Sequence, residues 1–253
     1  MTVLAKKKKR AKPKLSASMF KITGAHAKTK IDAKKKKLFY FKEKVKPEKA
    51  KKAAMKDGAE ILGVTPDALK VSKPALKYDF YCIYDAVLDL KFLRLRKQEL
   101  GVNDQVSGTY VGKEILIPKR GKSIPGKSIQ LDIVELFQLT RKDGMTVDGK
   151  TGGPADAIER LLKGPGKKKA TAAWVKKAKV SPGKFNSLEK VVKVVGKLAG
   201  QRPSDAKRVA HQVLTFNQLD GFYLPTYYVK VSDGAKSQVL RVNGINGAIS
   251  LAI

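Results

Sequence analysis

One segment of the chain matches the sequence pattern of a phosphate-binding loop. Residues 144–151 read Gly-Met-Thr-Val-Asp-Gly-Lys-Thr, which fits G-x-x-x-x-G-K-[ST]. In such a loop, backbone N–H groups and the lysine surround phosphates, and the final hydroxyl group binds magnesium. Gly149, Lys150 and Thr151 would have these roles here. Residues 152–154 (Gly-Gly-Pro) interrupt the helix that should begin at the lysine, so a hairpin followed by a basic loop is the alternative.

Lysine dominates the charge of the chain. The 253 residues include 54 Lys and Arg against 22 Asp and Glu, a formal net charge of +32, and only nine of the cations are Arg. Arginine forms bidentate hydrogen bonds to guanine edges and phosphates in a fixed geometry, whereas lysine acts mostly as a mobile point charge. The composition therefore predicts nucleic-acid binding that is sensitive to salt and tolerant of sequence.

Residues 1–53 form the most basic stretch, with twenty Lys or Arg and three acids. Such a density of like charge repels itself and cannot bury a core, so we expect an arm that is disordered when free. Within it, residues 38–41 (Leu-Phe-Tyr-Phe) either stack on bases or form a short strand that attaches the arm to its own domain. The arm residues predicted to contact phosphate are Lys6, Lys7, Lys8, Lys9, Arg10, Lys12, Lys14, Lys34, Lys35, Lys36 and Lys37.

A second basic segment spans residues 164–184, which include seven lysines and no acid. Two Gly-Pro or Pro-Gly breaks flank a short Ala-rich helix that contains Trp174, which either stacks on bases or packs in the core. The predicted phosphate contacts here are Lys167, Lys168, Lys169, Lys176, Lys177 and Lys184. A Gly/Pro/Lys loop near residue 120 adds Lys119, Arg120 and Lys122.

Few residues suit metal or covalent chemistry. Cys82 is the only cysteine, which excludes an internal disulfide and a thiolate zinc site. Only His26 and His211 could supply imidazole, so no His-rich metal cluster is expected. Acids at positions 79, 85 and 89 resemble a nuclease set, but we interpret them as turn or solvent-facing acids. We therefore expect no metal ion and no cofactor.

Residues 57–71 resemble a helix-turn-helix motif. Ala59 is small enough for helices to cross, Gly63 permits the turn, and Val64 and Leu69 would pack inward. Pro74 shortens the second helix to about two turns, so a plain helical hairpin is the alternative.

Runs of strand-like and helix-like residues predict an α+β fold. Helices are expected at residues 47–62, 155–163, 170–179, 188–198 and 205–219. Strands are expected within residues 78–96 (two, with a bend near 85–89), 106–117, 129–140, 145–147, 227–232, 238–242 and 248–251, with a hairpin turn at 141–144. The result is a mainly antiparallel sheet with a central helical segment at about 154–219, in a single domain over 54–253 that follows the basic arm.

These features favour a non-enzymatic, sequence-tolerant nucleic-acid-binding component of a large nucleoprotein assembly. The assembly could be a ribosome-like particle, a virion interior, or chromatin or a nucleoid, with RNA or DNA and other protein subunits as partners. A P-loop-type enzyme acting on nucleic acid and a helix-turn-helix DNA-binding protein are the alternatives. No apolar run reaches the eighteen or so residues that span a bilayer, and the N-terminus lacks the apolar core of a signal peptide. The expected location is intracellular or inside a particle.

Overall fold

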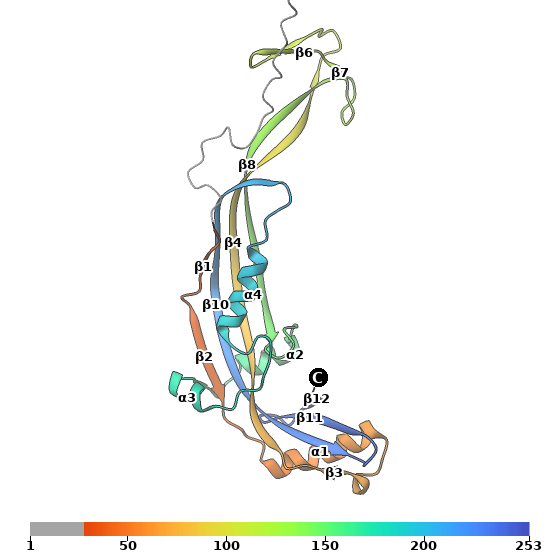
Figure 1. The fold of residues 1–253 in the computed structure, drawn as a ribbon, viewed down its shortest axis with the longest axis vertical. Helices are drawn as coiled ribbons and strands as arrows, with labels where there is room; N and C mark the ends of the chain where they lie inside the picture. The colour runs from red at the N-terminus through yellow and green to blue at the C-terminus, as the bar shows by residue number, and fades with distance from the viewer. Residues whose placement is uncertain (1–27, 253) are drawn as a thin grey trace, which may run out of the picture. The chain divides into compact units, whose positions relative to one another are not determined.

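The computed structural model describes residues 28–252 (Figure 1), which are mostly sheet, with 49% strand and 20% helix. Contacts divide these residues into two compact units. Unit 1 contains residues 89–140 and 201–212 together with 28 and 29. Unit 2 contains residues 30–88, 141–200 and 213–252. Strands β4, β8 and β10 supply residues to both units.

Twelve strands are formed by the described residues. They are β1 (Lys30–Asp32), β2 (Lys36–Phe41), β3 (Lys70–Val71), β4 (Ala75–Val102), β5 (Thr109–Val111), β6 (Glu114–Leu116), β7 (Lys119–Arg120), β8 (Lys127–Asp148), β9 (Lys167–Lys169), β10 (Ala206–Ser232), β11 (Ser237–Asn243) and β12 (Ile249–Leu251). The helices are α1 (Pro47–Leu62), the 3-10 turn η2 (Pro66–Ala68), α2 (Asp156–Lys163), α3 (Ala172–Lys177) and α4 (Leu188–Ala199).

Ten strands make one mixed sheet, with the path β12-β11-β10-β4-β8-β7, and β5 and β6 make a separate hairpin. The strands β1 and β2 pair with β10 in parallel, whereas β11 and β3 pair with it in antiparallel. The sheet is therefore mixed, where the sequence predicted a mainly antiparallel one. The parallel pairs arise because the N-terminal segment, which sequence reasoning left outside the domain, supplies two strands.

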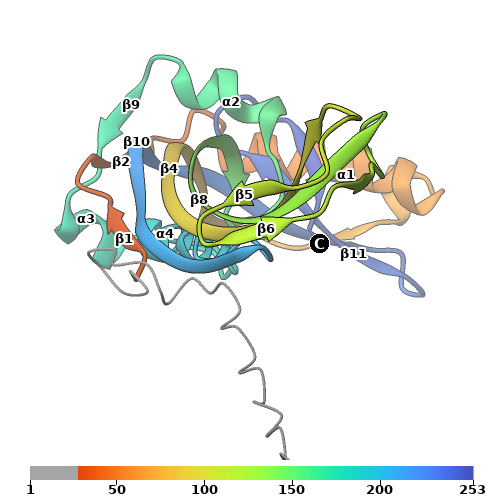
Figure 2. The same cartoon turned by 90° about the horizontal axis from the view of Figure 1, so that it is seen from above.

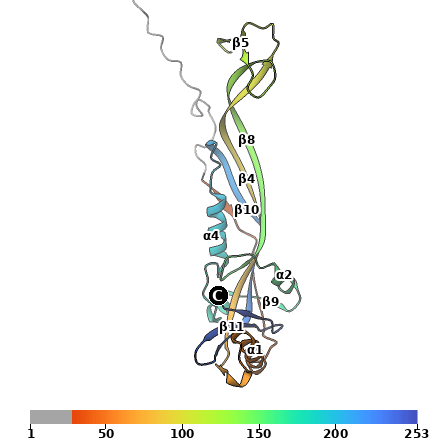
Figure 3. The same cartoon turned by 90° about the vertical axis from the view of Figure 1, so that its right-hand side faces the viewer.

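In unit 2, alternate residues of the strands face two separate apolar clusters. Helix α4 packs on the face that includes Phe80, Cys82 and Tyr223, and helix α2 packs on the face that includes Tyr81 and Phe222. Figure 3 shows α4 and α2 on opposite sides of these strands. This division follows from the period of two along a strand, and it places neighbouring residues of one strand in different surroundings.

Helix α1 covers a third cluster of unit 2, formed mainly by β10 and β11. It begins at Pro47 and ends at Gly63, whose φ of 71° suits glycine. Its buried positions hold only small residues, among them Ala54 and Gly58. A Cβ atom at Gly58 would lie 3.0 Å from the Val231 side chain, so small residues set how closely the helix approaches the sheet.

In unit 1, Leu90, Phe92 and Val209 form a small buried cluster against Phe137. Arg94 covers the ring of Phe137, with its guanidinium carbon 4.1 Å from the ring centroid. The same side chain donates a 2.6 Å hydrogen bond to Glu135 and lies 3.5 Å from Asp205.

The segment expected to be a helix at 205–219 is strand, so the helical region ends at Ala199. Val209, Gln212, Phe216 and Leu219 are buried, with the three-four-three spacing of a helix face. On β10 this spacing arises because the alternation of buried residues shifts phase along the strand. The predicted helices at 47–62, 155–163, 170–179 and 188–198 are present, the third of them shortened to Ala172–Lys177.

Two further predictions about strands were wrong. Residues 78–96 belong to one continuous strand, β4, rather than to two. The predicted hairpin turn at 141–144 lies inside β8, which continues to Asp148. Here Asp143 accepts a 2.8 Å hydrogen bond from the Tyr84 hydroxyl group, a cross-strand contact that a sequence pattern does not reveal.

Ordered structure also begins earlier than the predicted end of the arm at residue 53. Strands β1 and β2 and the start of α1 lie within residues 28–53. The apolar side chains of residues 38–41 explain this difference, because they bury against the sheet and offset the repulsion of the neighbouring lysines. Of the two alternatives for this segment, the strand is the one observed.

Candidate nucleic-acid interface

The structure brings together two predicted lysine clusters that lie far apart in the sequence. Strand β9 pairs with β2 in antiparallel, with Phe39 opposite Lys169 and Phe41 opposite Lys167. Figure 2 shows the two strands side by side. We call the resulting group the β2–β9 lysine surface; it consists of Lys36, Lys37, Lys167, Lys168 and Lys169, all of them exposed.

Aromatic residues support this surface from inside the protein. The Lys167 ammonium group lies 5.6 Å from the ring centroid of Phe39 and 5.8 Å from that of Phe222. The two rings stack on each other at 5.4 Å. Such contacts hold the lysine stem against the rings while the ammonium group remains available to an anion.

A cavity of about 440 Å³ adjoins the lysine surface, lined by Lys36, Lys37 and Lys169 together with Leu188 and Glu189. Lys36 lies 3.7 Å from Glu189, and both side chains are well exposed. A single exposed ion pair of this kind contributes little to stability, and it leaves most of the positive charge of the surface uncompensated.

The lysines of α3 are less closely gathered. Lys176 and Lys177 are exposed in the last turn of the helix. Trp174 faces inward: its ring stacks on Tyr40 at 4.3 Å and contacts the rings of Tyr78 and Tyr223. Of the two roles considered for this tryptophan, core packing is the one observed.

The phosphate-loop pattern at 144–151 forms a tight turn whose amides bond to the protein itself. The Asp148 carboxylate accepts hydrogen bonds from the amides of Lys150 (2.7 Å) and Thr151 (3.4 Å). The Gly149 amide donates to the Phe80 carbonyl at 2.8 Å. A phosphate cradle needs these same N–H groups, and the following helix begins only at Asp156. The geometry matches a basic turn rather than a nucleotide site.

Lys184 lies beside this turn, since its amide donates to the Lys150 carbonyl at 3.4 Å. The predicted contacts Lys119 and Arg120 form β7 in unit 1, and the Lys122 amide donates to Glu99 at 2.7 Å. Lys34 and Lys35 precede β2 and are exposed, and Lys34 lies 3.9 Å from Asp32. The predicted contacts Lys6, Lys7, Lys8, Lys9, Arg10, Lys12 and Lys14 lie outside the described residues, as does His26.

A buried polar network went unrecognised in the sequence. Asp79 is only 2% exposed, although it was interpreted as a turn or solvent-facing acid. It accepts hydrogen bonds from the Arg241 guanidinium group (2.6 and 3.1 Å), from the Tyr228 hydroxyl group (2.6 Å) and from Ser181. Arg241 lies 162 positions later, so only the fold could reveal the pair.

Burial also controls the titration of neighbouring groups on β4. It raises the pKa of the Cys82 thiol to about 12, and it raises the pKa of Tyr81 to about 12 although Arg241 acts to lower it. A buried thiol that stays protonated is a poor nucleophile, so Cys82 acts as a core residue.

The segment at 57–71 contains no second helix. Pro66–Ala68 is a single 3-10 turn, and Lys70–Val71 forms a strand that pairs with β10. The element that would read a DNA groove is therefore missing from the motif.

Among residues 28–252, no group of three or more His, Cys, Asp or Glu side chains is arranged to hold a metal ion. None of the helices described is long and apolar enough to cross a membrane. The chain matches no protein-family model, no curated protein and no solved structure.

Proposed function

We propose that this protein is a non-enzymatic, sequence-tolerant nucleic-acid-binding component of a nucleoprotein assembly. The observation that carries the proposal is the pairing of β2 with β9, which concentrates five exposed lysines from two distant segments. Ammonium groups held this closely repel one another, and a polyanion relieves that repulsion while its own counterions are released.

Because the cations are lysines rather than arginines, they favour contact with the phosphate backbone of the nucleic acid over contact with its bases. All five cations of the surface are lysines, which act as point charges and do not form the bidentate hydrogen bonds to a base edge that arginine forms. The twenty Lys and Arg residues of positions 1–53 add to the attraction. RNA and DNA both present the phosphates that such a surface would bind. Other protein subunits of the assembly would bind the same nucleic-acid molecule.

Charge reversal on β9 tests the proposal. The variant Lys167→Glu, Lys168→Glu, Lys169→Glu should bind single-stranded nucleic acid about tenfold more weakly at ~0.1 M salt, and the slope of log K against log salt should become shallower by about 2. The matched control is Lys49→Glu, Lys51→Glu, Lys52→Glu on the exposed side of α1, which changes the net charge equally.

Fluorescence anisotropy of a labelled oligonucleotide over a salt series gives both quantities. If the two variants lost the same affinity and the same slope, the attraction would depend on total charge and the β2–β9 lysine surface would have no special role.

A further inference from the structure

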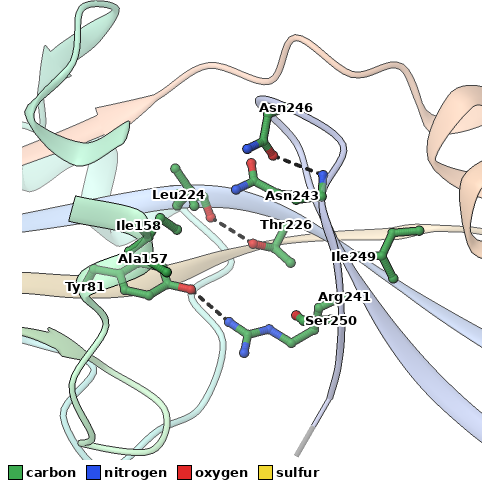
Figure 4. A pocket seen from close by; sticks show the side chains of 11 residues that line it. Tyr81, Ala157, Ile158, Leu224, Thr226, Arg241, Asn243, Asn246, Ile249 and Ser250 are labelled. Atoms are coloured by element: carbon green, nitrogen blue, oxygen red, sulfur yellow. Dashed lines mark hydrogen bonds between the residues drawn. The ribbon is translucent and has the colours of Figure 1, made fainter. Parts of the chain in front are cut away.

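Unit 2 contains a second cavity, of about 280 Å³, between α2, β10 and the β11–β12 turn. Figure 4 shows polar side chains around it. They include Tyr81, Thr226, Arg241, Asn243 and Asn246. Its volume lies near the lower end of the range of about 300–1,000 Å³ for small-molecule sites, so it suits a single small, flat group.

The two asparagine side chains of the lining offer hydrogen-bond donors. The side-chain oxygen of Asn243 accepts from the Ile245 amide at 2.8 Å, and that of Asn246 accepts from the Ala248 amide at 3.0 Å. Because these bonds fix which end of each side chain is the oxygen, the NH₂ groups are the ends left to meet a ligand. A ligand that fits must therefore present acceptor atoms.

The charge around the cavity disfavours an anion. Arg241 is hydrogen-bonded to Asp79 at 2.6 Å and lies 3.9 Å from Asp148, so two carboxylates accompany one guanidinium group. A phosphate group placed here would meet a locally negative environment. A neutral ligand with acceptor atoms meets no such repulsion.

Apolar side chains form the remaining walls. Ile158 of α2, Leu224 of β10 and Ile249 of β12 line the same cavity. Apolar walls beside a polar edge match the two kinds of surface that a nucleobase has, its ring faces and its hydrogen-bonding edge.

The cavity lies along the same strand face as Lys167 of the β2–β9 lysine surface, whereas Lys36 pairs with Glu189 of α4 on the opposite face. Phe222, under the Lys167 ammonium group, and Leu224 and Thr226, which line the cavity, are alternate residues of β10. Alternate residues share a face, and four residues of strand span about 13 Å. A few nucleotides of extended single strand cover that span, so one chain could contact the lysines and the cavity together.

We infer that this cavity binds one unpaired pyrimidine base of the uracil or thymine type from a single-stranded nucleic acid. The inference rests on the proposed function. Uracil and thymine carry two carbonyl acceptors that match the donors of Asn243 and Asn246, and the N3–H group between them can donate to a hydroxyl oxygen of the lining such as that of Thr226. Adenine has only one acceptor, N1, beside the amino group of its pairing edge, so it can satisfy only one of the two asparagines there.

Oligothymidylate and oligoadenylate of equal length, compared at one salt concentration, test the inference. The wild-type protein should bind oligothymidylate at least about fivefold more tightly, the discrimination of one good base contact. Ala157→Leu places a larger side chain at the wall of the cavity on exposed α2, where leucine suits a helix. It should abolish the preference and leave the salt slope unchanged.

Two further variants make the result decisive. Ala173→Leu, the same change on exposed α3, should keep the preference. Asn246→Ala removes one donor and should reduce the preference without adding volume. Equal binding of both oligonucleotides, or a preference that survives in Ala157→Leu and Asn246→Ala, would overturn the base site and leave the lysine surface standing. Failure to bind either oligonucleotide would overturn both proposals.

Discussion

At the scale of single residues, the pair of Asp79 and Arg241 joins β4 to β11 in the interior of unit 2. Their side chains are 3% and 10% exposed, and two further polar groups, the hydroxyl groups of Ser181 and Tyr228, complete the network around the carboxylate. Removing the Asp79 carboxylate leaves the buried Arg241 with only the more distant Asp148, 3.9 Å away, and leaves the hydroxyl groups of Tyr228 and Ser181 without their acceptor, which costs more than the pair itself contributes.

Asp79→Ala should therefore lower the free energy of unfolding by about 3–5 kcal/mol, measured by urea denaturation. Asp132→Ala serves as the control, because Asp132 is exposed on β8 and its loss should cost less than about 0.5 kcal/mol. Equal effects of the two substitutions would show that Asp79 is not buried with Arg241 in solution.

Cys82 makes the free energy of unfolding depend on pH in the alkaline range. Its pKa rises from 9.0 to about 12 on folding, because burial disfavours the thiolate. The folded state therefore keeps a proton that the unfolded state loses, so this contribution is complete below pH 9 and declines as the pH rises from 9 towards 12. The unfolding free energy of the wild type should approach that of Cys82→Ala over this range. A constant difference between the two proteins from pH 8 to pH 11 would contradict the burial of the thiol.

At the scale of elements, the local sequence pattern predicted the positions of four of the five expected helices correctly and the positions of the strands less accurately. Ser187 accepts a hydrogen bond from the Lys190 amide at the start of α4 and so caps the helix that was predicted at 188–198. The 206–219 segment was predicted wrongly because a phase shift in a strand imitates helical spacing. Local pattern identifies caps and turns, whereas β10 is decided by the strands that pair with it.

Trp174 attaches α3 to the sheet through its contacts with three tyrosine rings. Trp174→Ala should lower the free energy of unfolding by about 2–4 kcal/mol, since it removes a large aromatic group from a packed cluster. Circular dichroism during urea denaturation measures the change. Ile61→Ala, at a 48% exposed position of α1, is the control and should cost less than about 1 kcal/mol. A loss no larger than that of the control would mean that α3 is not packed as the structure describes.

At the scale of the whole molecule, the sequence suggested which lysines would contact phosphate, but it could not show which of them lie close together in the fold. Lys36 and Lys37 lie about 130 positions from Lys167–Lys169, and only the pairing of β2 with β9 brings them together. The phosphate-loop pattern at 144–151 is the reverse case, because its sequence suggested a site that the fold does not form. Its residues occur in the right order, but Asp148 and Phe80 already occupy the amides that a phosphate would need.

Deletion of residues 1–27 separates the charge of the N-terminal segment from the stability of the fold. The deletion leaves every strand and helix of residues 28–252 in place, so the thermal unfolding midpoint should stay within about 2 °C of the wild type. It should weaken nucleic-acid binding, because it removes eight of the Lys and Arg residues. Deletion of residues 1–53 removes β1, β2 and the start of α1 as well, and should lower the midpoint strongly. Equal midpoints for the two deletions would contradict the incorporation of β2 into the sheet.

The most direct test of the proposed interface is a lysine footprint of the full chain. Each lysine is acetylated at low reagent concentration, with and without a saturating single-stranded oligonucleotide, and its modification is followed by mass spectrometry. The account predicts that bound nucleic acid protects Lys36, Lys37, Lys167, Lys168 and Lys169, while Lys49, Lys51 and Lys52 on α1 react as before. Unchanged reactivity on β2 and β9 in a saturated complex would contradict it.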